Sequence, residues 1–318
     1  MIAELPTPTT PASVPDLETG TGEDPAPARP RARSGPPIPR PAVIGLAVIL
    51  LVSSTAVFLG LFVFALSGLQ EQRSQHQLYG KFRSLLDPAS QVAPQIGGHI
   101  RPGSPVALLN SAGADLHNLI VTEGTSSGNL LNGPGHLRDS PLPGQVGDSI
   151  LVAKSTTAGA PFRDITRLRP GDPIVVTTGQ GTFRYVVQGQ QVAGGRLPAY
   201  LAISGNLILV TSAGSGSFDP LAANHLVYVD AKLQGSAVTA PPGRPTTVPS
   251  DELPGRDDLQ AWPFMLGWFG LLIAGSIGAW WVWSRWGILR TWLIGAPILF
   301  GILWGLSTEL MRLVPNVY

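Results

Sequence analysis

The chain has no cysteine among its 318 residues, and it has few charged residues. The absence of cysteine excludes disulfide bonds, zinc sites with thiolate ligands and any cysteine nucleophile. Asp, Glu, Lys and Arg make up 13% of the chain, about half the share in an ordinary soluble domain. The formal net charge is +1, so no overall positive field attracts nucleic acid, and we expect no nucleic-acid partner. The low charge content instead points to a membrane protein.

Two segments have the composition of unfolded or connecting chain. Residues 1–41 are rich first in Pro, Thr, Ala and acidic residues and then in Pro and Arg, with almost no apolar pattern. We therefore expect a disordered tail there. Residues 236–260 are also rich in Pro, Gly and Thr, and this composition predicts a linker.

Three apolar runs are candidates for membrane-spanning helices, which need about 20 residues each. Residues 42–69 contain no charged residue. A signal peptide is the alternative for this run, but the long preceding segment, the length of the run and the lack of a small-x-small cleavage site oppose it. Residues 261–284 form a second span with tryptophans near its ends, and residues 288–307 form a third. A re-entrant segment stays open for the third run.

The basic residues that flank these runs predict the orientation. They lie before the first run and between the second and third runs, at Arg29, Arg31, Arg33, Arg40, Arg285 and Arg290. Because flanking arginines favour the cytoplasmic side, we expect a multi-pass protein of the cell membrane. Its N-terminus is predicted to be cytoplasmic, and residues 70–261 are predicted to be extracytoplasmic.

The outer part begins with a juxtamembrane helix and linker at 70–104, followed by a domain at 105–235. The domain consists of short apolar runs separated by Gly, Pro, Asn and Asp. The runs cover 106–109, 118–122, 149–153, 173–177, 182–187, 206–211 and 225–229. Short strands at this spacing predict a closed β-barrel. The predicted fold class is mostly β, with the barrel outside the membrane and one N-terminal and two C-terminal transmembrane helices.

Several short motifs in this domain resemble one family. They are Glu123–Ser126, Gly133–His136, Leu142–Gly144, Gly159–Asp164 and Leu168–Asp172. Together they are similar to the class E and F sortases of actinobacteria, transpeptidases that join surface proteins to the cell wall. The resemblance covers Pro105 to Leu233. It implies the sortase β-barrel and an extracytoplasmic location, and the latter agrees with the arginine pattern.

The chain departs from this family at the positions of its base and nucleophile. The family has a catalytic His in a Gly-His-Arg sequence at the end of one strand, and this chain has Lys154 there, followed by Ser155. The family's nucleophile is a Cys after a strand that ends in Thr, and here Thr211 is followed by Ser212. Serine needs a strong neighbouring base to act as a nucleophile, so the resemblance implies a site without sortase chemistry.

The third catalytic residue of the family is absent as well. The family has an Arg near the start of the last strand, where it stabilises charge on the substrate carbonyl. The corresponding candidates are Asn224 and His225, and no arginine occurs between Arg196 and Arg244. All three catalytic identities are therefore missing, and we expect no catalytic residue in this domain.

Three functional hypotheses follow. The first is a pseudoenzyme, a non-catalytic peptide-binding or scaffolding subunit of a cell-envelope complex. Its partners would be a membrane or cell-wall protein, an extended peptide like a sorting signal, and the lipid bilayer. The second is a hydrolase or transpeptidase with a Ser-Lys dyad, Ser212 and Lys154, which requires burial to lower the pKa of the lysine. The third is a structural membrane component whose barrel binds nothing specific.

The resemblance also implies a groove for an extended peptide. Its walls would be the loop after the Lys154 strand and the loop before the Ser212 strand. The candidate groove residues are Thr156, Thr157, Phe162, Leu197, Tyr200, Ile203 and Thr211. No ligand spacing for a metal ion occurs in the sequence, and no cofactor is predicted. His136 is expected to stabilise its loop.

Overall fold

The computed structural model describes residues 40–87, 95–192, 204–214 and 223–317. The chain divides into two units, Met1–Ile49 and Leu50–Tyr318, and all strands belong to the second. Part of the predicted disordered tail, residues 1–39, lies outside the described residues.

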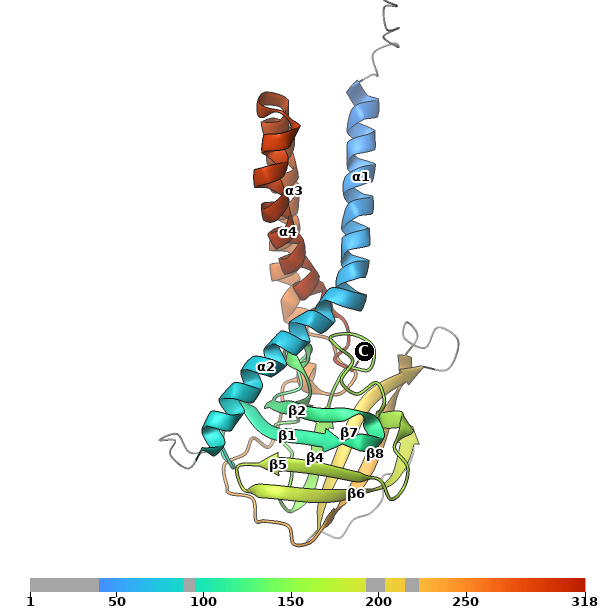
Figure 1. Cartoon of the computed structure of the whole chain (residues 1–318), viewed down its shortest axis with the longest axis vertical. Coiled ribbons are helices and arrows are strands. Elements are labelled where there is room, and N and C mark those ends of the chain that lie inside the picture. The colour runs from blue at the N-terminus through green and yellow to red at the C-terminus, as the bar shows by residue number, and fades with distance from the viewer. Residues whose placement is uncertain (1–39, 88–94, 193–203, 215–222, 318) are drawn as a thin grey trace, which may run out of the picture. The chain divides into compact units, whose positions relative to one another are not determined.

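Eight strands form a closed barrel, which confirms the predicted barrel (Figure 1). They are β1 Pro105–Ser111, β2 Leu116–Glu123, β3 Gly135–His136, β4 Gly147–Val152, β5 Pro173–Thr178, β6 Gly181–Val192, β7 Gly205–Gly214 and β8 Ala223–Gln234. Their order around the barrel is β1-β2-β3-β4-β7-β8-β6-β5. Seven of them lie where the apolar runs predict strands, and β3 is too short to give a pattern.

The alternation of side chains along β4 and β7 separates the core from the outer face. Leu151 and Leu209 are buried in the main core cluster, and Phe162 and Tyr185 belong to the same cluster. Because successive residues point to opposite faces of a strand, Val152 and its neighbours at i±2 point to the outer face.

The helices contain more residues than the eight strands, so the predicted class "mostly β" is wrong. They are α1 Arg40–Leu61, α2 Ser67–Leu86, α3 Trp262–Trp286 and α4 Ile288–Leu313. A π-helical turn at Phe62–Leu66 joins α1 to α2. Short 3₁₀ turns occur at Ala112–Ala114, Asn129–Asn132, Ile165–Arg167, Ser250–Glu252 and Leu259–Ala261. The fold class differs because the long helices outside the barrel contain more residues than its short strands.

Three helical stretches are long and apolar enough to cross a membrane: Val48–Leu86, Leu259–Arg285 and Leu289–Leu313. They correspond to one N-terminal and two C-terminal candidate spans. α3 and α4 pack closely where Gly305 faces Trp268, since a Cβ at Gly305 would lie 2.5 Å from the indole ring. The π-helical turn contacts α4 as well, because the rings of Phe62 and Trp304 meet edge to face at 5.1 Å.

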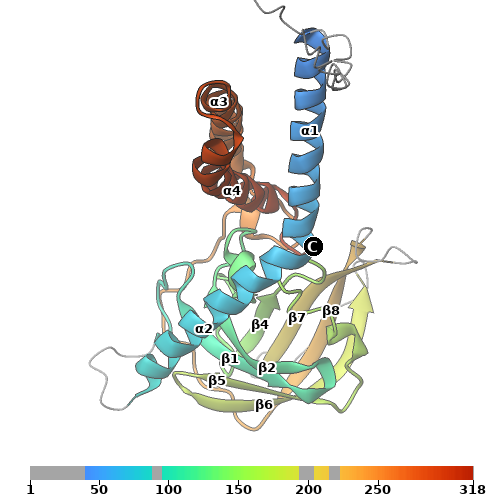
Figure 2. The same cartoon turned by 45° about the horizontal axis from the view of Figure 1, so that its top comes forward.

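α2 lies against β1 and β2 (Figure 2). Its apolar residues Leu78 and Phe82 are buried in one cluster with Ile120 of β2. The side chain of Gln75 completes the hydrogen bonding of this strand edge: its Oε1 accepts from the Ile120 N–H at 2.8 Å, and its Nε2 donates to the Ile120 carbonyl at 3.1 Å. The helix that continues from the first apolar run is therefore attached to the barrel.

The segment between β8 and α3, residues 236–260, is held against the barrel. Val238 forms an isolated bridge with Gln145. Arg244 Nη2 lies 2.8 Å from Glu123 Oε1, and Arg138 Nη2 lies 2.7 Å from Glu252 Oε1. Both ion pairs are largely buried.

Candidate functional site: two strand ends and the segment after α4

Parallel pairing of β4 with β7 brings the two residues of interest together. Val152 of β4 is paired with Val210 of β7, so Lys154 and Ser212 each lie two residues beyond a paired position. Both side chains are buried. The residue after the lysine completes the contact, because Ser155 Oγ lies 2.8 Å from Ser212 Oγ.

The segment that follows α4, residues 314–317, fills this site, and we call it the post-α4 segment. The Val317 carbonyl accepts a hydrogen bond from Ser212 Oγ at 2.7 Å and another from the Ser155 N–H at 3.2 Å. The proton of Ser212 is therefore directed at a backbone carbonyl. Ser155 Oγ also lies 3.4 Å from the Val317 carbonyl, so both hydroxyls face the same backbone group.

Lys154 faces the same segment from the other strand end. Its side chain is fully buried, and its Nζ lies 3.4 Å from the Pro315 carbonyl and 3.5 Å from Ser127 Oγ. Burial lowers the pKa of Lys154 from 10.5 to about 7. Among the described residues no hydrogen bond or ion pair joins Lys154 to a carboxylate or to Ser212.

Ser127 ties the end of α4 to the barrel. Its hydroxyl proton is shared between the carbonyls of Val314 at 2.8 Å and Met311 at 3.0 Å. These carbonyls belong to the last turn of a helix and to the residue after it, where backbone carbonyls lack partners within the helix. Ser127 thus acts as a cap, and its proton is not directed at Lys154.

Asn316 is the most completely bonded residue of the post-α4 segment, and it is fully buried. Its Nδ2 donates to the carbonyls of Thr125 at 2.8 Å and Leu253 at 3.0 Å. Its Oδ1 accepts from the Gly255 N–H at 2.8 Å, and its own N–H donates to the Arg256 carbonyl at 2.9 Å. All these partners are backbone groups, so the site matches the donors and acceptor of one amide side chain.

Val317 occupies an apolar pocket on the outer face of β4 and β7. It is 1% exposed, and it belongs to a cluster with Leu130, Val152, Ile208 and Val210. Full burial of a valine side chain contributes on the order of 1.5–3 kcal/mol. The segment is therefore held by an apolar contact as well as by hydrogen bonds.

The predicted groove residues lie in different places in the structure. Phe162 is part of the barrel core rather than of a groove, and Thr211 is buried with its hydroxyl donating to the Ala153 carbonyl at 2.9 Å. Thr156 is half-buried and Thr157 is buried in the loop after β4. Leu197, Tyr200 and Ile203 lie outside the described residues.

The two candidates for the missing arginine position lie on β8. His225 is half-buried and pairs with Ala213 of β7, and Asn224 lies next to it in the strand. Among the described side chains, His225 forms no hydrogen bond with Ser212.

His136 of β3, which was predicted to stabilise a loop, is the centre of a buried polar network. Its Nδ1 lies 3.0 Å from Glu123 Oε2, and its Nε2 lies 2.9 Å from the Pro141 carbonyl. Ser140 Oγ lies 3.1 Å from Nε2 but donates its proton to the Leu137 carbonyl at 2.8 Å. Because that proton is already used, the Ser-His-Glu arrangement does not provide an activated nucleophile.

Sequence reasoning missed Ser127 and the whole post-α4 segment. Ser127 lies in a loop with other small polar residues, and nothing local distinguishes it. The only local signal in the segment is Pro315 after the helix, which marks a helix end and says nothing of a distant binding site.

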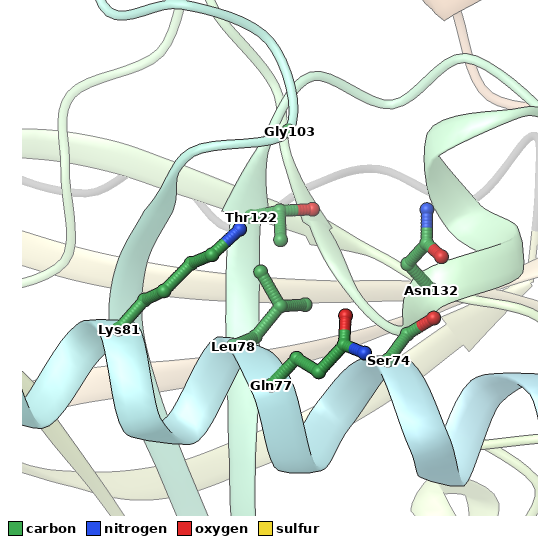
Figure 3. Close-up of a pocket in the computed structure, with 7 residues that line it drawn as sticks. All are labelled: Ser74, Gln77, Leu78, Lys81, Gly103, Thr122 and Asn132. Carbon is green, nitrogen blue, oxygen red and sulfur yellow. The ribbon is translucent and has the colours of Figure 1, made fainter.

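A pocket between α2 and the barrel lies apart from this site. Figure 3 shows Leu78 and Lys81 extending from α2 toward Thr122 of β2, while Gln77 extends toward Ser74 of the same helix. Ser74, Gly103 and Asn132 complete the lining. The pocket shares no residue with the Lys154–Ser212 site.

A family model for the sortase domain matches residues 113–212. The chain carries a sortase family domain. The matched range includes Lys154 and ends at Ser212, and this sortase domain contains no cysteine. The comparison with curated proteins finds no match.

Solved sortase structures resemble the chain. A Sortase D5 transpeptidase from Clostridium perfringens is 20% identical over 51% of this chain and 99% of its own, with a TM-score of 0.41. Sortase E from Streptomyces avermitilis is 28% identical over 43% of this chain and 91% of its own, with a TM-score of 0.37. SrtF sortase from Corynebacterium diphtheriae is 20% identical over 51% and 98%, with a TM-score of 0.38.

Proposed function

We propose that the protein is a membrane-anchored, extracytoplasmic pseudosortase of actinobacterial type. It serves as a non-catalytic peptide-binding or scaffolding subunit of a cell-envelope complex. One observation carries the proposal: the residues at the base and nucleophile positions bind carbonyls of the post-α4 segment instead of each other. Ser212 donates to Val317, and Lys154 faces Pro315.

The chemistry of transpeptidation supports the same conclusion. The reaction needs an activated nucleophile, a proton donor for the leaving amine and stabilisation of the tetrahedral intermediate. The hydroxyl of Ser212 already donates to a carbonyl, and no arginine is bonded to it in the described part of the chain. Loss of a single charge-stabilising donor costs roughly 3–4 kcal/mol in the barrier.

An activity assay tests this proposal. The full chain in detergent micelles is incubated with a quenched fluorescent peptide containing a Leu-Pro-type sorting sequence and with an amine acceptor. An active cysteine sortase in the same micelles is the positive control. We expect no cleavage or transfer above the rate without protein. Turnover that disappears in Ser212→Ala or Lys154→Met would reject the proposal.

The membrane topology belongs to the same proposal. Three stretches are long and apolar enough to span, and arginines lie before the first and between the second and third. Arginine enrichment on the cytoplasmic side supports a cytoplasmic N-terminus and an extracytoplasmic barrel. A partner in the membrane or the cell wall would then meet the barrel outside the cell.

A second candidate function rests on Lys154. A fully buried lysine with a pKa of about 7 is the kind of base that a Ser-Lys hydrolase needs. Lys154 Nζ lies 3.5 Å from Ser127 Oγ, and Ser127 could act as a nucleophile only after its hydrogen bonds to the Val314 and Met311 carbonyls break. Ser127→Ala separates the two dyads, because activity that depends on Lys154 and Ser127 but survives Ser212→Ala would identify this pair.

A further inference from the structure

A polar pocket of about 400 Å³ lies between four parts of the chain. These are the start of α2, the loop after β2, the turn before α3 and the last turns of α4, represented by Gln70, Asn129, Asp258 and Glu309. Its volume is in the range of pockets that hold a small molecule. None of its lining residues belongs to β4 or β7, so the pocket is separate from the two strand ends.

The pocket lies where the apolar runs end. Gln70 directly follows the first apolar run, and Thr308 directly follows the third. Asp258 precedes α3, whose first residue, Trp262, is 48% exposed, and tryptophans are enriched at membrane interfaces. Because the ends of membrane-spanning runs meet the headgroup region of a bilayer, the pocket lies at the depth of lipid headgroups.

An ion-pair network forms one wall of the pocket. Arg312 donates from Nη2 and Nε to Asp258 Oδ2 at 2.6 and 3.0 Å, and from Nη1 to Glu309 Oε2 at 2.9 Å. A guanidinium group has five N–H donors, so two are left over from these contacts. Glu309 Oε1 accepts no hydrogen bond from the described residues. With two carboxylates and one guanidinium, this wall carries one excess negative charge.

Three amide side chains add to the polar lining. They belong to Gln70, Asn129 and Asn132, and all three residues are half-buried. Within the described part of the chain, the hydrogen bonds of Asn129 and Asn132 involve only their backbone atoms. Each amide has two N–H donors and a carbonyl acceptor. The two asparagines therefore offer donors and acceptors that the protein itself does not use.

We propose that this pocket binds the headgroup of a membrane phospholipid in which a primary ammonium group lies next to the phosphate, as in the ethanolamine type. The ammonium group donates to the Glu309 carboxylate, and the phosphate accepts from the remaining N–H groups of Arg312 and from the Asn129 amide. The excess negative charge of the wall disfavours a headgroup that is only anionic. A trimethylammonium group has no N–H to donate, so a choline headgroup binds more weakly.

Lipid selectivity of the unaltered chain is the first test. The full chain in detergent micelles is mixed with equal amounts of an ethanolamine, a choline and a glycerol phospholipid that have the same acyl chains. Native mass spectrometry then counts the lipids that stay bound. We expect the ethanolamine lipid to be retained at least fivefold more often than either of the others. This comparison does not depend on the folding of any variant.

Two variants, each with a matched control, locate the bound lipid. Glu309→Gln should reduce the preference for ethanolamine over choline to less than twofold, whereas Asp139→Asn, at an exposed position outside the pocket, should leave it unchanged. Asn129→Ala should reduce retention of the ethanolamine lipid at least threefold, whereas Asn110→Ala, on β1, should not. An unchanged preference in a folded Glu309→Gln variant would place the lipid elsewhere and overturn the proposal.

A soluble headgroup distinguishes a lipid from a free ligand. Glycerophosphoethanolamine has the same charged groups without acyl chains. It should displace the ethanolamine lipid only in large excess, because the lipid tails also partition into the micelle. Displacement at equal concentration would assign the pocket to a soluble compound and overturn the lipid as its ligand.

The inference rests on the proposed membrane anchoring but not on the absence of catalysis, and vesicle flotation separates the two. The full chain reconstituted into vesicles of choline phospholipid should float with them, whatever the pocket binds. A chain that does not float overturns the membrane anchoring. A chain that floats but retains the three lipids equally overturns the headgroup site alone.

Discussion

The hydroxyl of Ser212 donates to the backbone carbonyl of Val317 at 2.7 Å, although the two residues are 105 positions apart in the chain. Ser212 lies near the end of β7, and Val317 follows the last apolar helix. This hydrogen bond therefore connects the strand end where the resemblance to sortases places the nucleophile to the segment after α4. The predictions below concern this connection.

Asn316→Ala should destabilise the protein by about 2–4 kcal/mol. The substitution removes one amide and leaves the buried carbonyl of Thr125, the partly buried carbonyl of Leu253 and the N–H of Gly255 without that partner. Unsatisfied buried groups each cost about 1–3 kcal/mol, and local rearrangement recovers part of this. The change in unfolding free energy is measured by denaturant unfolding of the full chain in micelles.

Asn110→Ala is the matched control, because the exposed amide oxygen of Asn110 accepts one backbone hydrogen bond. This substitution should change the unfolding free energy by less than about 1 kcal/mol. An equal effect of the two variants would contradict the role of Asn316.

Lys154→Met should remove a pH dependence of stability. The pKa of Lys154 falls from 10.5 to about 7 on folding, so the unfolded chain binds more protons between these values. Stability from this group is therefore complete above pH 10.5 and decreases as the pH falls toward 7, with a slope that approaches about 1.4 kcal/mol per pH unit. Below about pH 7 the loss is constant.

Unfolding free energies of both proteins between pH 7 and 9.5 test this prediction. The difference, unaltered chain minus Lys154→Met, should increase with pH. Lys232→Met is the control, since Lys232 is exposed and should show no such trend. A flat difference for Lys154→Met would mean that Lys154 is not buried as a neutral amine.

The fold was largely readable from the sequence, and the site was readable only in part. Alternation and turn residues located the longer strands, but the two residues of β3 are held by pairing with β2 and β4 and have no pattern of their own. The proximity of Lys154 and Ser212 followed from the resemblance to sortases. The burial of Lys154 did not, because a lysine is ordinarily exposed and the groups that cover it come from Pro315 and Ser127. Contacts between such distant segments leave no local trace.

The orientation of the barrel is tested by labelling in intact cells. Single cysteines at Ser250 and Thr182, both exposed positions, should react with a membrane-impermeant maleimide before lysis. The absence of native cysteine makes the background low. A cysteine in the region of Arg29 to Arg40 should react only after lysis. Labelling in the opposite order would reverse the proposed topology.

Ser212→Cys should give a thiol that is protected by the post-α4 segment and inactive as a nucleophile. Position 212 is 3% exposed, and the Val317 carbonyl lies directly on its side-chain oxygen. We therefore expect iodoacetamide to alkylate the thiol at position 212 at least tenfold more slowly than the thiol of Ser250→Cys. Weakening the segment with Asn316→Ala should raise the alkylation rate at position 212 by about tenfold, which corresponds to about 1.4 kcal/mol of lost protection.

Neither protein should transfer a sorting-type peptide, because no imidazole or arginine is bonded to position 212 in the described part of the chain. Equal alkylation rates with and without Asn316→Ala would show that the segment does not cover the strand end. Peptide transfer by Ser212→Cys alone would show that the remaining groups of the site suffice for catalysis.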